Sequence, residues 1–525
     1  MSDADIVNVA MVVVTLACVL AGYPVAFSLG GMALLFALGA WMFGLFDLAF
    51  VTAIVDRIFG FMMNEVLLAV PLFIFMGIML ERSKVAEDLL LNMGAMFGSV
   101  RGGLSVSVTV VGALLAASTG IVGATVVTMG LLALPTMLQR RYDPALACGS
   151  IAAAGTLGQI IPPSLVLVLL GDVMSASYQS AQLKKGIFAP ESVSVSDLFA
   201  GALLPGLVLA GLYIVYQLVV AWLRPESSPA IPRSELQWTG EPGRWLRLAE
   251  TLAPPVILIV AVLGSILAGI ATPTEASAVG AVGAIMLAGL RFDVRRRWMM
   301  RLAGLCVVVL LVVNGLFDLR VARTDIATAD RIGIAIAMLA CAGIAAGIAV
   351  SLIGAWRQRM LQEVLQSTAR LTAMVFVIII GAGIFSLVFR GFGGEDLVHG
   401  LLSDMPGGVI GAMLVVMAVI FLLGFFLDVV EIIFVVVPIV APILLMMDIS
   451  PVWLGVMIAL NLQTSYLTPP FALSLFYLRS VIPPSVRTAD LYRGIIPFVV
   501  IQVIALIALG LFPGLATWLP KAMFG

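Results

Sequence analysis

The chain alternates long apolar runs with short polar segments, and most of the runs approach the length of a membrane span. A helix needs about 20 predominantly apolar residues to cross the hydrocarbon core. In lipid, every backbone polar group has to be satisfied within its own segment, which favours helices. The pattern therefore predicts an all-α polytopic membrane protein with apolar segments at residues 5–22, 24–44, 66–82, 102–139, 145–160, 162–172, 198–223, 250–270, 275–291, 302–317, 331–355, 369–390, 408–447, 451–466, 469–480 and 494–519.

Four prolines recur at a constant offset, which indicates an internal repeat. The pairs, each separated by 307 positions, are Pro135 and Pro442, Pro144 and Pro451, Pro162 and Pro469, and Pro163 and Pro470. Proline removes a backbone donor and breaks a helix, so the two double prolines predict two discontinuous helices. Breaks at corresponding points of two halves are the best sequence indication of a transport site near the bilayer midplane. The alternative is that each double proline is a kink that only shapes packing.

The long apolar block 102–139 has basic residues on both sides. Arg101 precedes it, and Arg140 and Arg141 follow it. Because cytoplasmic loops are enriched in Lys and Arg, both ends are expected on the cytoplasmic side. The block then forms a re-entrant helical hairpin with its tip at 118–120, about halfway along.

The same offset relates this block to a second one at 408–447. No Lys or Arg lies between Arg390 and Arg479, which fits a hairpin that enters from the outer face. Two hairpins that enter from opposite faces, each followed by a broken helix, predict an inverted-repeat transporter. The alternative is that each block consists of two ordinary short spans.

The remaining loops set the orientation and the division of the chain. The arginine clusters at 291–301 and 356–370 are expected in the cytoplasm, and the N-terminus, which has no basic residue before Arg57, is expected outside. The predicted divisions are N-terminal scaffold helices at 1–65, a first inverted repeat at 66–172 (hairpin 102–139, broken helix 145–172), scaffold helices at 173–297 with a cytoplasmic linker at 224–247, an inserted helix pair at 298–356, a second inverted repeat at 357–480 (hairpin 408–447, broken helix 451–480) and a C-terminal helix at 481–525.

Composition narrows the function classes. Hydrophobic residues make up 62% of the chain and charged residues 11%, whereas soluble domains carry about 25% charged residues. A net charge of −1 gives no indication of nucleic-acid binding. With one histidine, the chain has neither a histidine proton relay nor a histidine metal site, and it lacks the Walker, HExxH and GxSxG motifs. We therefore expect a protein that is not an enzyme and has no cofactor.

The two breaks and the two hairpin tips supply the candidate site residues. Backbone carbonyls freed by proline, together with hydroxyl oxygens, suit a small hard cation such as Na⁺, and a half-helix N-terminus suits an anion. The candidates for substrate binding are Ser118, Thr119, Gln159, Pro162, Ser164, Thr464 and Pro469. The candidates for Na⁺ binding are Ser118, Gly120, Gly123, Gly158, Ile161, Asp428, Ser465 and Thr468.

Asp428 at the second tip has two open interpretations. A carboxylate inside the membrane is costly and is by default a functional candidate, so it could help to bind a cation. It could equally cap the second arm of the hairpin at its N-terminus. Glu431 lies three residues on and would complete such a cap.

The chain resembles a known transporter family in several short stretches. They are Gly22–Phe27, Val70–Gly77, Tyr142–Ala145, Gly155–Ser164, Gly269–Ala276 and Asn461–Pro470. In combination, and spread over residues 20 to 500, they resemble the large membrane (permease, DctM-type) subunit of TRAP (tripartite ATP-independent periplasmic) transporters.

The resemblance implies a mechanism and partners that composition does not show. Such subunits are Na⁺-coupled elevators in the bacterial inner membrane, where a domain of hairpins and broken helices slides against a scaffold. They receive an organic acid from a soluble periplasmic binding protein and pair with a small four-helix membrane subunit, expected here as a separate chain. The first tip with the break at 158–164 would form one cation site, and the second tip with Ser465 and Thr468 another. The pair 302–355 resembles an insertion relative to shorter relatives.

These observations predict Na⁺-coupled uptake of a small organic anion, most simply a carboxylate, by the permease of a tripartite system. One alternative is a stand-alone Na⁺/carboxylate symporter that needs no binding protein. Another is a membrane scaffold subunit that does not transport.

Overall fold

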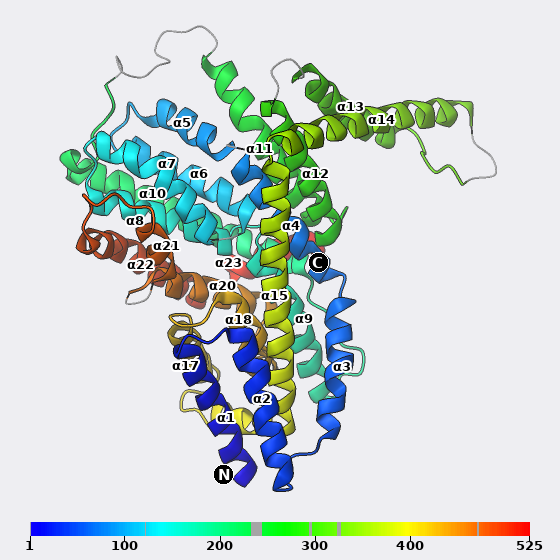
Figure 1. Cartoon of the computed structure of the whole chain (residues 1–525), viewed down its shortest axis with the longest axis vertical. Helices are drawn as coiled ribbons and strands as arrows, with labels where there is room; N and C mark the ends of the chain where they lie inside the picture. Colours follow the sequence, from blue (N-terminus) through cyan, green and yellow to red (C-terminus); the bar gives the residue numbers. More distant parts are fainter. Residues whose placement is uncertain are drawn as a thin grey trace.

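The computed structural model describes residues 2–83, 85–120, 122–232, 244–292, 297–322, 327–469 and 472–525. Within these ranges the regular structure is entirely helical (Figure 1). Nine of the described helices are long and apolar enough to cross a membrane, or up to eleven elements if each of two bent helix pairs counts as one span. The expectation of an all-α polytopic membrane protein is therefore confirmed.

The helices of the first half follow the predicted order. They are α1 (Asp3–Leu20), α2 (Val25–Met42), α3 (Ala49–Met62), η1 (Val66–Leu68), α4 (Ala69–Arg82), α5 (Val85–Phe97), α6 (Gly103–Thr119), α7 (Val122–Gln139), α8 (Pro144–Thr156), η2 (Leu157–Gln159), α9 (Leu165–Lys184), α10 (Val195–Leu223) and η3 (Pro225–Ser227). Pro144 occupies the first turn of α8, where the missing N–H costs nothing, and Asp143 caps that helix through the Ala145 N–H.

The second half contains the remaining helices. They are α11 (Arg244–Leu267), α12 (Pro273–Phe292), α13 (Arg297–Leu316), α14 (Thr328–Arg357), α15 (Met360–Gly391), α16 (Gly394–Ser403), α17 (Gly408–Leu423), α18 (Val429–Val435), α19 (Val437–Met446), α20 (Pro451–Leu467), α21 (Leu473–Arg479), α22 (Thr488–Leu511) and α23 (Gly514–Phe524). Part of the predicted linker 224–247 lies outside the described residues, as do positions 293–296 of the arginine cluster.

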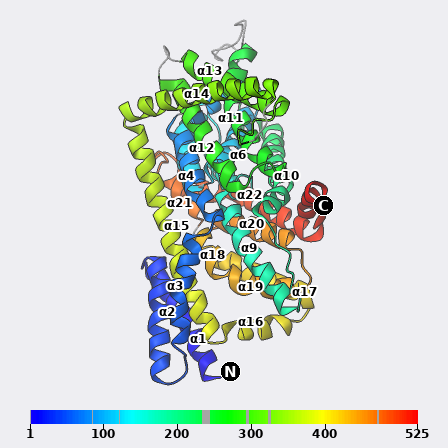
Figure 2. The same cartoon turned by 90° about the vertical axis from the view of Figure 1, so that its right-hand side faces the viewer.

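The two halves repeat the same helix order with opposite direction. Helices α7 and α18 begin 307 positions apart, at Val122 and Val429, and so do α8 and α20, at Pro144 and Pro451. The hairpin α6–α7 lies in the upper part of the molecule and the hairpin α17 with α18 and α19 in the lower part (Figures 1 and 2). This arrangement is the inverted repeat that the proline offset predicts.

Several helix limits differ from the predictions for identifiable reasons. Helix α9 continues to Lys184, twelve residues past the apolar run 162–172, because its polar residues line a cavity rather than end the helix. Residues 481–525 form two helices, since α22 ends one residue before Phe512-Pro513 and proline commonly follows a helix end. The amphipathic helix α3, which was not among the predicted apolar runs, bends by 58° into α4.

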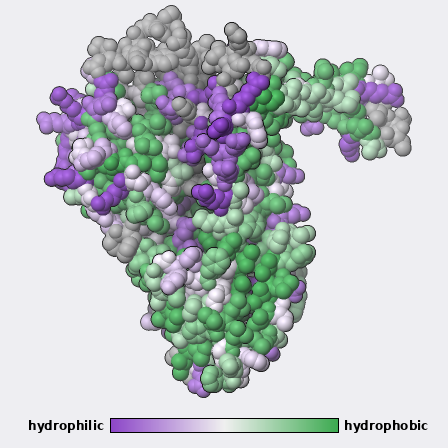
Figure 3. Space-filling view, viewed as in Figure 1, coloured by the Kyte–Doolittle hydropathy of each residue, from purple (hydrophilic) through white to green (hydrophobic). Residues whose placement is uncertain are grey.

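Helices α13 and α14 pack along each other and form an arm that projects from the rest of the molecule (Figure 1). Helix α14 also lies against α12 and α15. The surface of the arm is mainly apolar along its length (Figure 3). Its exposed large side chains include Leu302, Leu305, Val308, Leu311, Met338 and Leu339. A surface of this kind needs cover by lipid or protein.

Candidate functional site

The first helix break separates α8 from α9. Helix α8 ends at Thr156, a single 3-10 turn follows, and α9 does not begin until Leu165. The Ser164 hydroxyl, which is fully buried, donates a hydrogen bond of 2.9 Å to the Gln159 carbonyl. Gly158 and Ile161 are buried in the same break, and the peptide bond between Pro162 and Pro163 is cis. The break is therefore a folded, closely packed feature of the interior.

The second break has the same construction at equivalent positions. Helix α20 ends at Leu467, and Thr468 and Pro469 follow it in non-helical backbone; Pro470 lies outside the described residues. The buried Ser474 hydroxyl donates to the Tyr466 carbonyl at 3.0 Å. Gln159 and Tyr466 are 307 positions apart, so one serine beyond each break satisfies the same freed carbonyl. Each serine hydroxyl thus replaces the backbone N–H that a carbonyl loses when proline breaks the helix.

The two breaks meet directly. The Gln463 side-chain amide donates to the Thr156 hydroxyl at 3.4 Å, and these two residues are again separated by 307 positions. Both are buried, with exposed fractions of 0%. Residues equivalent by a twofold relation come into contact only where they lie near its axis. The contact therefore places both breaks at the centre of the inverted repeat.

Helices α10 and α22 complete a polar cluster around this contact. The Gln502 side-chain amide donates to the Tyr213 hydroxyl at 2.8 Å and lies 3.5 Å from the Thr156 hydroxyl. The side-chain carbonyl oxygens of Gln159, Gln463 and Gln502 are buried and have no hydrogen-bond partner in the described part of the chain. An unpartnered buried carbonyl costs about 1–3 kcal/mol, so three of them near one break indicate a place where a cation or water belongs.

Both hairpin tips reach the breaks. Gly120 has φ +60°, and a Cβ at this position would lie 3.0 Å from the Leu165 backbone nitrogen. At the second tip, Gly424 leaves no room for a Cβ beside the Ser465 side chain. The two hairpins therefore come from opposite ends of the molecule and both end at the level of the helix breaks. Gly123 lies beyond the first tip and faces the Tyr477 ring.

The structure describes the side chains of some of the other predicted residues but not of all. Ser118 and Thr119 end α6, but their side chains lie outside the described part of the structure. The hydroxyls of Thr464, Ser465 and Thr468 each donate to a carbonyl one turn earlier, at 2.7–2.8 Å. Only the lone pairs of these three oxygens remain for a ligand.

Asp428 caps helix α18. Its carboxylate accepts the Val429 N–H at 2.8 Å, and the Glu431 carboxylate accepts the Asp428 N–H at 2.9 Å, which forms a capping box. The Tyr466 hydroxyl donates to the Asp428 carboxylate and accepts the Val429 N–H at 3.0 Å. Tyr466 thus ties the second tip to the second break, a link that sequence spacing does not reveal.

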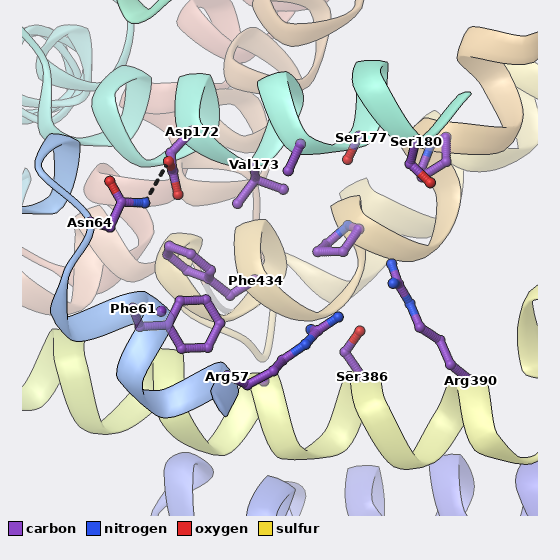
Figure 4. A pocket seen from close by; sticks show the side chains of 15 residues that line it. Arg57, Phe61, Asn64, Asp172, Val173, Ser177, Ser180, Ser386, Arg390 and Phe434 are labelled. Carbon is purple, nitrogen blue, oxygen red and sulfur yellow. Dashed lines mark hydrogen bonds between the residues drawn. The ribbon is translucent and has the colours of Figure 1, made fainter. Parts of the chain in front are cut away.

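A separate cavity of about 420 Å³ lies beside this centre. Helices α3 and α15 form one wall, and α9, α18 and α19 form the other. At one end the Asn64 side-chain amide donates to the Asp172 carboxylate at 2.8 Å (Figure 4). Toward the other end Arg57 and Arg390 extend into the space between the walls (Figure 4).

None of the predicted site residues whose side chains the structure describes lines this cavity. The rule that intramembrane carboxylates are functional candidates would have identified Asp172. Arg57 lies on α3, which has no long apolar run to mark it as part of the membrane domain.

The Arg390 guanidinium is 2.7 Å from a Glu395 carboxylate oxygen, and the other oxygen of that carboxylate is 2.9 Å from the Lys184 ammonium. Arg57 makes no hydrogen bond or ion pair within the described residues. The cavity therefore has one cationic end, where Arg57 makes no direct ion pair with a described residue, and one end with an acceptor carboxylate.

Comparisons with known proteins agree with this architecture. The family model described as "Tripartite ATP-independent periplasmic transporter, DctM component" matches residues 12–313 and 307–515. The chain is 27% identical to the C4-dicarboxylate TRAP transporter large permease protein of Vibrio cholerae, over 98% of this chain and 97% of that protein. It is 25% identical to the ectoine/5-hydroxyectoine permease of Ruegeria pomeroyi, over 91% of each, and 24% identical to the sialic acid permease of Vibrio cholerae, over 96% of each.

Among solved structures, the Alcanivorax borkumensis YdaH transporter matches with a TM-score of 0.54 at 15% identity, over 88% of each chain. That likeness concerns the fold alone. The proline repeat, the paired hairpins and the near full-length family match lead to one conclusion: this chain belongs to the DctM-component family, the large permease subunits of TRAP transporters.

Proposed function

We propose that this permease couples the inward movement of Na⁺ to the uptake of a small organic anion, most simply a carboxylate. The observation that carries the proposal is the contact between Gln463 and Thr156, which joins the two helix breaks beside buried, unpartnered amide oxygens. Broken helices near the midplane bind coupling ions through unwound backbone carbonyls in other transporters.

The hydrogen bonding at the breaks favours a cation there. The hydroxyl hydrogens of Ser164, Thr464, Ser465 and Thr468 are used by backbone carbonyls, so these oxygens offer lone pairs and not donors. Lone pairs, backbone carbonyls and amide oxygens suit Na⁺. Of the predicted substrate contacts, Ser164 and Thr464 therefore fit a cation better than an anion.

The anion requires donors instead. Helix α9 begins at Leu165 inside the protein, with no side-chain cap hydrogen bond at its N-terminus. The first turn of a helix presents free N–H groups and the positive end of the helix dipole. The substrate carboxylate would bind at this end, next to Pro162 and the first hairpin tip, with the cations on the opposite side of the tips.

The names of the relatives support a proposal for the partners of this chain. The curated relatives are named as large permease proteins of TRAP systems. We propose that this chain likewise works with a soluble periplasmic binding protein and a separate small four-helix subunit in the bacterial inner membrane. The hairpins and broken helices would move as an elevator against a scaffold that contains α3 and α15.

The proposal is tested in proteoliposomes that contain the complete complex and an inward Na⁺ gradient. Thr468→Ala and Ser118→Ala should each lower the uptake rate at subsaturating Na⁺ by at least about tenfold, equivalent to about 1.4 kcal/mol at one ligand. Thr517→Ala is the matched control, because the Thr517 hydroxyl also donates to a carbonyl one turn earlier, at 3.2 Å, but lies exposed on α23. Uptake that is unchanged in both site variants would refute the assignment.

A further inference from the structure

We infer that the cavity between α3–α15 and α9–α18–α19 is an outer binding site for a monocarboxylate whose opposite end bears hydrogen-bond donors, such as hydroxyl groups or a cationic nitrogen. The inference rests on the proposed function and specifies its substrate class. It comes from the two chemically different ends of the cavity, which no predicted site residue occupies.

The cationic end accounts for one carboxylate. Arg57 from α3 and Arg390 from α15 extend from the same wall into the cavity, on either side of Ser386 (Figure 4). Arg390 pairs directly with Glu395, whereas the Arg57 guanidinium makes no direct ion pair with a described residue and interacts with Glu395 only at longer range. Two neighbouring guanidinium groups repel each other, and a carboxylate between them would lower that repulsion and could accept bidentate hydrogen bonds. Arg57, Arg390 and Lys184 share the single carboxylate of Glu395, so this end keeps an excess of positive charge that a ligand carboxylate would reduce.

The opposite end selects against a second carboxylate. Asp172, when ionised, can only accept hydrogen bonds, and the Asn64 amide occupies one of its oxygens. A ligand carboxylate placed here would meet a like charge in a partly enclosed space. Hydroxyl or ammonium groups would instead donate to Asp172. The two ends are about 12 Å apart along α9, from Asp172 to Ser180, which suits a ligand of several carbon atoms.

The middle of the cavity contains a polar group without a partner. The Ser386 hydroxyl is 2% exposed, lies between Arg57 and Arg390 and has no hydrogen-bond partner in the part of the chain that the structure describes (Figure 4). Buried hydroxyls are normally hydrogen-bonded. A ligand carboxylate held by the two arginines would also accept from this hydroxyl.

The positive charges of Arg57 and Arg390 have no counterparts at the equivalent positions of the internal repeat. The positions related to Arg57 and Arg390 by the offset of 307 are Val364 and Ser83, and neither is charged. The pair Arg57 and Arg390 therefore marks the lower half of the molecule, toward the N-terminus, which the loop charges predict to lie outside. A site that accepts an anion from the outside needs positive charge on the outer side of the molecule, and the two arginines supply it there.

The test measures ligand binding and transport separately on the intact complex. Thermal stabilisation is recorded with three probes taken from the names of the relatives: sialic acid and ectoine, which each carry one carboxylate and donor groups, and succinate, which carries two carboxylates. The expected order is stabilisation by sialic acid or ectoine at concentrations at least tenfold lower than succinate requires. Tighter binding of succinate, or no stabilisation by any of the three, would overturn the inference.

Variants identify the cavity as the site. Arg57→Gln should raise the KM for uptake at least tenfold and leave the maximal rate within twofold, and Arg57→Lys should restore part of the affinity. Asp172→Asn should bring succinate binding at least tenfold closer to that of the monocarboxylates. Arg82→Gln is the matched control, since Arg82 pairs with Glu363 at 3.1 Å with both side chains about half exposed. An unchanged KM in Arg57→Gln, with Na⁺-driven uptake intact, would refute this inference alone; absence of Na⁺-driven uptake in the unmodified complex would refute the proposed function.

Discussion

The substitution Tyr466→Phe isolates the link between the second hairpin tip and the second break. It removes one hydroxyl and keeps the ring, which is 4% exposed. The lost interactions are the hydrogen bond to the Asp428 carboxylate and the acceptor for the Val429 N–H at 3.0 Å. Val429 keeps its second acceptor, the Asp428 carboxylate at 2.8 Å. The expected loss is therefore that of one hydrogen bond to a charged group, about 1.5–3 kcal/mol.

This loss should appear as easier opening of the tip. A change of about 2 kcal/mol corresponds to a roughly 30-fold larger open population. Hydrogen exchange of a peptide covering residues 424–431 should therefore lose about 30-fold in protection, while a peptide from α22 should keep its protection. Tyr216→Phe is the control, because Tyr216 packs edge-on against Phe498 at 5.1 Å, away from the tip. Equal protection of the tip in Tyr466→Phe and the unmodified protein would show that this contact does not hold the tip closed.

Three further substitutions probe the centre of the repeat. Gln463→Leu removes the amide that joins the breaks and should raise the Na⁺ concentration for half-maximal uptake about tenfold; an unchanged value would contradict a cation at this position. Gly120→Ala should lower the free energy of unfolding by about 1–3 kcal/mol more than Gly186→Ala, since both glycines have positive φ but only Gly120 is crowded; equal melting temperatures would refute this. Asp428→Asn keeps a side chain that can cap α18 but removes the negative charge at the helix N-terminus, so it should cost about 0.3–1 kcal/mol and leave the stabilisation by Na⁺ intact; loss of that stabilisation would instead make Asp428 a cation ligand.

The centre of the molecule was predictable because it obeys the repeat. The prolines at a constant offset located both breaks, and the structure adds that Thr156 and Gln463, related by that same offset, touch. The capping interpretation of Asp428 followed from local spacing to Glu431 and is confirmed. A cap of this kind can be predicted from the sequence because its two partners, Asp428 and Glu431, are only three residues apart.

The surroundings of the centre were not predictable in the same way. Tyr213 and Gln502 reach Thr156 from helices that the repeat does not relate, and their separation of 289 positions carries no pattern. Asp172 interrupts an apolar run, so the run ended there in the prediction although the helix continues to Lys184. A polar residue that faces a cavity and one that ends a helix look alike in a hydrophobicity pattern.

If the two joined breaks bind the coupling ion, transport by this permease depends on the Na⁺ gradient. The most direct measurement is the initial rate of uptake by the reconstituted complex as the inward gradient is changed from Na⁺ to K⁺, with the membrane potential and a pH gradient held constant. The account predicts uptake that depends on the Na⁺ gradient and falls to background in K⁺. Full activity in K⁺ with the pH gradient alone would contradict it.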